Sequence, residues 1–207
     1  MKTQKELSPQ QKQVWLKAMG AMEQRNYPYV IQLCQGLLLN NPDFLDGRKL
    51  ARKAAIEKSK AAKKGFFSGL GGGSAIALMK ASGLRRKDDL VGLLPALEEI
   101  FAEDPFNPQA NTLLKEAALK WDPPMRDLAF FAMDTVLKGN PKDKDHLKRY
   151  AEFCMEHDES GRPRDPARAV EIYNKLLVLS PNDMAAIKGS KDAAAAQSVH
   201  SGGWEVA

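Results

Sequence analysis

The chain has few of the residues that build catalytic and metal sites. Its 207 residues include only three histidines and two cysteines, and aromatic residues make up 7% of the total. Cys154 and His157 could offer two metal ligands from one helix, but structural zinc usually needs four, and the sequence holds no second Cys or His pair. No Ser-His-Asp or Cys-His arrangement is present either. We therefore expect no metal, no cofactor and no enzymatic activity.

Long apolar runs and strand-like alternation are also missing. No uncharged apolar run is long enough to span a bilayer, and the first residues are polar, unlike a secretory signal. Cys34 and Cys154 fall on the apolar faces of predicted helices, which favours buried free thiols in a reducing compartment. These features predict a cytoplasmic protein, and the abundance of Leu and Ala favours an all-α fold.

A glycine-rich stretch, residues 65–73, does not match a phosphate-binding loop. Such loops follow a buried strand, and a P-loop ends in Gly-Lys-Ser or Gly-Lys-Thr. Here a lysine-rich helical segment precedes the glycines. We interpret the stretch as a flexible loop and exclude nucleotide binding.

A recurring spacing of apolar residues and prolines is the strongest positive signal in the sequence. Four segments carry apolar residues at offsets zero, four, seven and eight and a proline at offset twelve: Val30-Cys34-Leu37-Leu38-Pro42, Leu93-Leu97-Ile100-Phe101-Pro105, Ala129-Met133-Val136-Leu137-Pro141 and Ala169-Tyr173-Leu176-Leu177-Pro181. These offsets place the apolar side chains on one face of a helix. Proline lacks a backbone N–H, so each segment predicts a helix that ends just before its proline.

A small residue precedes each of these segments. Ala18, Ala81 and Ala117 stand twelve residues before the first apolar position, and Ala151 stands eighteen residues before it because a loop is inserted. A small side chain lets two helices approach closely, so we expect four antiparallel helix pairs with these alanines at their contacts.

Paired helices with a small residue and a closing proline resemble the tetratricopeptide repeat (TPR) family, with degenerate repeats. The resemblance implies a right-handed superhelical solenoid of antiparallel helix pairs, formed as a single domain over residues 8–198. Four repeats and a capping helix would occupy residues 9–42, 74–105, 107–141, 143–181 and 182–198. Residues 199–207 would form a flexible tail.

In TPR stacks the first helix of each pair lines a concave groove that takes a peptide or a helix. The resemblance therefore implies a non-catalytic scaffold that binds another protein. It places ten residues in the groove: Trp15, Met19, Met22, Leu78, Arg85, Arg86, Asn111, Leu114, Trp121 and Lys148. The alternative is that the tryptophans pack between repeats.

Residues 43–73 do not fit the alternation of repeat helices. The sequence predicts a helix over 43–64 with a thin alanine stripe, so we expect it to be longer and more exposed than the others and to project from the stack. Between Arg48 and Lys64 it carries eight basic residues against the single acidic Glu57.

Three interpretations of this basic segment remain open. It could be a solvated face, a contact with an anionic membrane surface, or a nucleic-acid contact, which is the least favoured because no aromatics are interleaved with the basic residues. The residues of the predicted basic surface are Arg48, Lys49, Arg52, Lys53, Lys60, Lys63, Lys64, Phe66 and Phe67.

Overall fold

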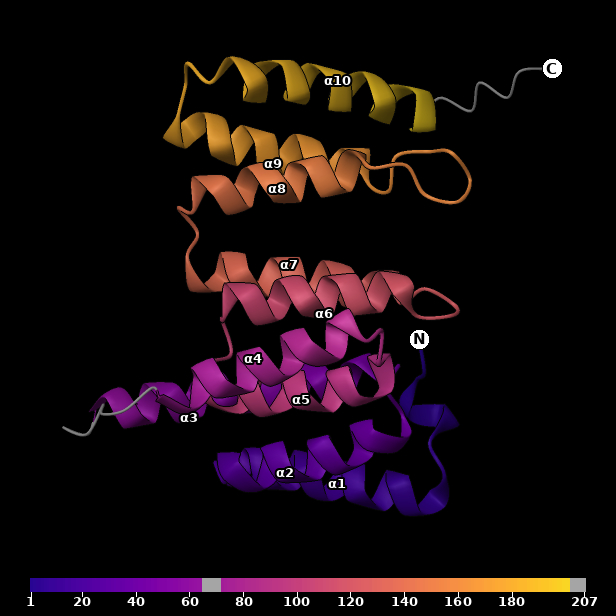
Figure 1. Cartoon of the computed structure of the whole chain (residues 1–207), viewed down its shortest axis with the longest axis vertical. Coiled ribbons are helices and arrows are strands. Elements are labelled where there is room, and N and C mark those ends of the chain that lie inside the picture. The colour runs from indigo at the N-terminus through magenta and orange to yellow at the C-terminus, as the bar shows by residue number, and fades with distance from the viewer. Residues whose placement is uncertain (65–71, 202–207) are drawn as a thin grey trace. The chain divides into compact units, whose positions relative to one another are not determined.

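The computed structural model describes residues 1–64 and 72–201, and this part of the chain is helical (Figure 1). It contains a short 3-10 helix and ten α-helices: η1 (Gln4–Glu6), α1 (Pro9–Glu23), α2 (Tyr27–Asn40), α3 (Leu45–Lys64), α4 (Gly72–Arg86), α5 (Leu90–Glu103), α6 (Pro108–Lys120), α7 (Arg126–Gly139), α8 (Lys144–Met155), α9 (Pro166–Leu179) and α10 (Met184–Ser201). No strand occurs within the described ranges. The all-α prediction is confirmed.

The chain divides into two compact units, Met1–Val136 and Leu137–Ala207. In the first unit α1 packs on α2, α2 on α3 and α4 on α5, while α5 also contacts α3 and α6. In the second unit α9 packs against both α8 and α10. The single domain expected over residues 8–198 stays a prediction.

The helices end where the prolines predict. The helices α2, α5, α7 and α9 each stop two residues before the proline of their segment. In three of the four connections a side chain then caps the next helix. Asn107, Asp143 and Asp183 accept hydrogen bonds of 2.9, 2.9 and 3.0 Å from the backbone N–H three residues further on. At the remaining connection, Asn41 instead donates its side-chain amide to the Leu37 carbonyl at 2.8 Å.

The four small residues lie where close helix packing was predicted. Ala18, Ala81, Ala117 and Ala151 are all fully buried. The prediction from the alanine spacing is therefore confirmed for their burial.

The extra helix α3 differs from its prediction in its first half. With 20 residues it is long, and in Figure 1 its C-terminal end extends beyond the neighbouring helices of its unit. Its N-terminal half is core, however, because Ala51, Ala54 and Ala55 are buried in one cluster with α1, α2 and Phe44, the residue just before α3. The expectation of an exposed, weakly docked helix was wrong there. Alanines on one face let α2 and α5 approach α3 closely.

The glycine in the first turn of α3 allows the Phe44 ring to lie against the helix. A Cβ at Gly47 would lie 2.7 Å from Phe44 Cδ1, and the Phe44 ring packs edge-on against Trp15 with the centroids 5.1 Å apart. We expect Gly47→Ala to lower the free energy of unfolding by about 1–3 kcal/mol through overpacking.

The matched control for this prediction is Gly36→Ala in α2, where a Cβ would meet nothing within 4 Å. That change is expected to raise the free energy of unfolding by about 0.4–1 kcal/mol, because alanine loses less backbone entropy on folding than glycine. Urea denaturation followed by circular dichroism measures both variants. Equal effects of the same sign would contradict the packing argument.

Candidate functional site

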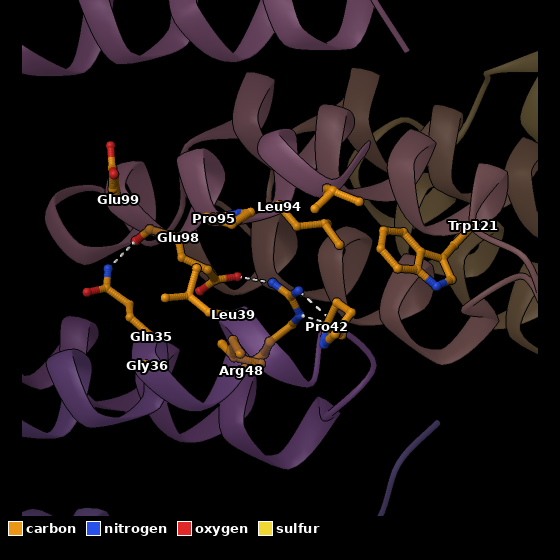
Figure 2. Close-up of a pocket in the computed structure, with 12 residues that line it drawn as sticks. Gln35, Gly36, Leu39, Pro42, Arg48, Leu94, Pro95, Glu98, Glu99 and Trp121 are labelled. Carbon is orange, nitrogen blue, oxygen red and sulfur yellow. Dashed lines mark hydrogen bonds and ion pairs between the residues drawn. The ribbon is translucent and has the colours of Figure 1, made fainter. Parts of the chain in front are cut away.

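A cavity of about 240 Å³ opens between α2, α3 and α5 in the first unit. Figure 2 shows α5 along one side, α2 along the other, and Trp121 at one end. The lining residues are Gln35, Gly36, Leu38, Leu39, Pro42, Arg48, Val91, Leu94, Pro95, Glu98, Glu99 and Trp121. Most of the wall is apolar, and at its rim Leu39 and Val91 are 64% and 74% exposed. We refer to this cavity as the α2–α5 pocket.

A buried ion pair lies on the floor of the α2–α5 pocket. Arg48 is 1% exposed and Glu98 5%, and Arg48 Nη1 donates a short hydrogen bond to Glu98 Oε1. Arg48 also donates from Nε and Nη2 to the Pro42 carbonyl, at 3.3 and 3.0 Å. The pair joins α3 to α5, and the contact with Pro42 ties it to the end of α2.

Two further polar groups belong to the wall. Gln35 Nε2 donates to the backbone carbonyl of Glu98 at 3.1 Å, which links α2 to α5. Pro95 lies inside α5, and because proline has no N–H it cannot donate the hydrogen bond that the Val91 carbonyl would receive in a regular helix. Both Val91 and Pro95 line the pocket.

A second arginine is buried one turn along α3. Arg52 is 3% exposed and donates from Nη1 to the Pro105 carbonyl at 2.7 Å and to Asn111 Oδ1 at 3.0 Å. Its guanidinium carbon lies 3.5 Å from the centroid of the Phe101 ring. Burial lowers the pKa of Arg52 to about 10, with the Glu98 carboxylate opposing that shift. At neutral pH the guanidinium is therefore still charged.

These two arginines correct the predicted basic surface. Arg48 and Arg52 share a helix face with Ala51 and Ala55, so they lie inside the apolar stripe and not on the solvated side of α3. Arg48 donates from all three of its guanidinium nitrogens, whereas Arg52 is held through Nη1 and the Phe101 ring, and its buried Nε has no hydrogen-bond partner among the described residues.

The rest of the predicted basic surface is exposed or outside the described residues. Lys49 and Lys53 are exposed, and Lys60 is exposed but forms an ion pair of 2.7 Å with Glu57. The side chains of Lys63 and Lys64, together with Phe66 and Phe67, lie outside the described residues, as do most of the loop 65–73 and of the tail 199–207.

The predicted groove is also corrected in part. Trp15, Asn111 and Leu114 are buried in the core, Trp15 at 6% exposure because α3 brings Phe44 against it. These three side chains cannot form a continuous binding surface, and Trp15 behaves as the alternative interpretation expected. The others remain accessible: Met19, Arg85, Arg86 and Lys148 are exposed, and Met22, Leu78 and Trp121 are half-buried.

Of the ten predicted groove residues, only Trp121 lines the α2–α5 pocket. Sequence reasoning placed Arg48 on the basic surface and did not identify the other lining residues as a site, including Leu39, Val91 and Glu98. Two signals were available: a carboxylate within the apolar face of a predicted helix, between Leu94, Leu97 and Phe101, and a proline inside that same helix. Both mark a helix with an unusual environment.

The described residues can be compared with what metal binding, membrane insertion and thiol chemistry require. Within these residues no group of three or more His, Cys, Asp or Glu side chains is placed to hold a metal ion, and no helix is long and apolar enough to cross a membrane. Cys34 and Cys154 are buried thiols, as predicted. Burial, reinforced by the Glu98 carboxylate, raises the pKa of the Cys34 thiol to about 12, so that thiol stays protonated at neutral pH.

Comparison with protein-family models, with curated proteins and with solved structures found no match to this chain.

Proposed function

We propose that this protein is a non-catalytic, cytoplasmic scaffold that binds a segment of another protein in the α2–α5 pocket. The observation that supports the proposal is an apolar pocket with large exposed apolar residues, Leu39 and Val91, at its rim. Ligand and cofactor pockets commonly have volumes of about 300–1,000 Å³. A cavity of about 240 Å³ suits one anchoring side chain, and the exposed rim suits the chain on either side of that anchor.

The fold supports this function in a form related to TPR stacks. Paired helices with buried alanines at their contacts and helices that end before prolines are what the resemblance implied. We include in this proposal that the helix pairs form a right-handed solenoid. The proposed binding position differs from the expected concave groove. Three of the expected groove residues, Trp15, Asn111 and Leu114, are buried in the core and cannot contact a partner.

The alternative of a membrane-surface adaptor has less support than the sequence suggested. In the described part of α3, Arg48 and Arg52 are buried, and Lys58 and Lys60 pair with Glu103 and Glu57 at 2.6 and 2.7 Å. Among the residues of α3 whose side chains are described, the exposed cations without such a partner are Lys49 and Lys53. Two lysines near an anionic bilayer contribute on the order of 1 kcal/mol each, which salt weakens.

A selection from a random peptide display library on the immobilised full chain tests the proposed function. Enriched peptides should bind the wild type, and Leu39→Asp should weaken their binding at least tenfold because it places a charge at the apolar rim. The matched control is Leu16→Asp in α1, since Leu16 is 66% exposed and does not line the pocket. Failure to enrich peptides, or equal effects of the two substitutions, would contradict the proposal.

A further inference from the structure

The donor side chains Arg48 and Gln35 on the floor and wall of the α2–α5 pocket already make hydrogen bonds within the protein. All three guanidinium nitrogens of Arg48 make hydrogen bonds within the protein, to Glu98 and to the Pro42 carbonyl. Gln35 Nε2 donates to the Glu98 carbonyl.

One buried acceptor is only half used. The Glu98 side chain is 5% exposed, and Arg48 bonds to its Oε1; no other hydrogen bond reaches this carboxylate from the residues that the structure describes. Figure 2 shows the carboxylate between α2 and α5 with one oxygen joined to Arg48. Each carboxylate oxygen can accept more than one hydrogen bond. Glu98 Oε2 is thus available to a donor that enters the pocket.

A second acceptor lies in the wall. The Val91 carbonyl lacks its usual helical donor because that donor position is occupied by Pro95. Glu98 lies among apolar lining residues that include Leu38, Leu94 and Trp121.

Charge selects among the donors that could enter. Lysine and arginine carry donors, but Arg48 already neutralises the buried Glu98 carboxylate, and the other lining carboxylate, Glu99, is 63% exposed. A second cation beside Arg48 would lose its water among apolar side chains without a buried counter-charge, which costs free energy. Leucine and phenylalanine fit the apolar wall but have no donor. Tryptophan and tyrosine combine a large apolar ring with one neutral donor.

We propose that the partner segment anchors in the α2–α5 pocket through a tryptophan or tyrosine whose N–H or O–H donates to Glu98 Oε2. This inference rests on the proposed function and adds the identity of the anchor. The ring replaces water along the apolar wall, and the donor satisfies the free oxygen of the buried carboxylate.

The test compares two probes of the same shape on the full chain. N-acetyl-tryptophanamide carries an indole N–H, and N-acetyl-3-benzothienylalaninamide has sulfur in its place. Titration followed by the backbone amide resonances of the protein should show about tenfold weaker binding of the benzothienyl probe, because a hydrogen bond to a charged group contributes at least that factor. Leu39→Asp should weaken both probes, and Leu16→Asp should weaken neither.

The variant Glu98→Gln supplies a second measurement. Its amide can keep an oxygen towards Arg48 and present N–H groups to the pocket, so the preference for the indole should disappear. Circular dichroism shows whether this variant folds, and the wild-type comparison decides the question without it. Equal affinities of the two probes, or no binding of either, would overturn the aromatic anchor. Peptides enriched by the library selection would still support the proposed function.

Discussion

Glu98→Ala is expected to lower the free energy of unfolding by about 3–5 kcal/mol, because it leaves the buried charge of Arg48 without its counter-charge. The lost carboxylate also removes the buried ion pair that joins α3 to α5. Urea denaturation at neutral pH, followed by circular dichroism, measures the change, and urea is preferred because guanidinium salts screen ion pairs.

Two matched variants separate this effect from a general sensitivity of α5. Glu99→Ala changes the next residue, whose side chain is 63% exposed and lies 3.9 Å from Lys80, so its effect should stay below about 0.5 kcal/mol. The double variant Arg48→Met/Glu98→Leu removes both charges and should recover most of the loss, since apolar replacements of buried ion pairs are often neutral or better. Similar losses for Glu98→Ala and Glu99→Ala would show that the pair does not stabilise the fold.

The helices could be predicted from the sequence because their signals are local. The offsets of apolar residues define one face of a helix, and the prolines define where it ends, so the observed ends follow the prolines at a constant distance. Ala18 and its three counterparts are buried for the same reason, since their spacing from each apolar segment fixes the helix face they occupy.

The environment of the basic residues could not be predicted from local signals. A run of eight basic residues counts as a charged surface only if its members face solvent, and the face of α3 was assigned from its alanines alone. Arg48 and Arg52 donate hydrogen bonds to residues that lie about 50–60 positions away in the sequence. These acceptors include Glu98, Pro105 and Asn111. No periodicity reports such long-range pairs.

The binding surface was misplaced for a related reason. The resemblance assigns groove positions from the order of helices within each pair, and α3 is an additional helix that falls outside that order. The start of α3 brings Phe44 against Trp15. Arg52 of α3 donates a hydrogen bond to the Asn111 side chain. Two predicted groove residues therefore serve to hold α3 in place, and the pocket forms where α2 and α5 face each other across α3.

Arg52→Ala is expected to lower the free energy of unfolding by about 2–4 kcal/mol. The substitution leaves the Pro105 carbonyl and Asn111 Oδ1 without the donor they share, and each unpaired buried acceptor costs about 1–3 kcal/mol. It also removes the guanidinium that stacks on Phe101, a contact that can contribute about 2 kcal/mol where water is excluded. The relief of a desolvated charge offsets part of this loss.

The neighbouring residue provides the decisive control, since Lys53 has the same charge and belongs to the same helix but is exposed. Lys53→Ala should change the free energy of unfolding by less than about 0.5 kcal/mol. If the basic run were a uniform solvated face, both alanine variants would unfold at nearly the wild-type urea concentration. A large loss confined to Arg52 means that this part of the run stabilises the core, and that a binding partner attracted by charge can reach only the lysines on the other side of α3.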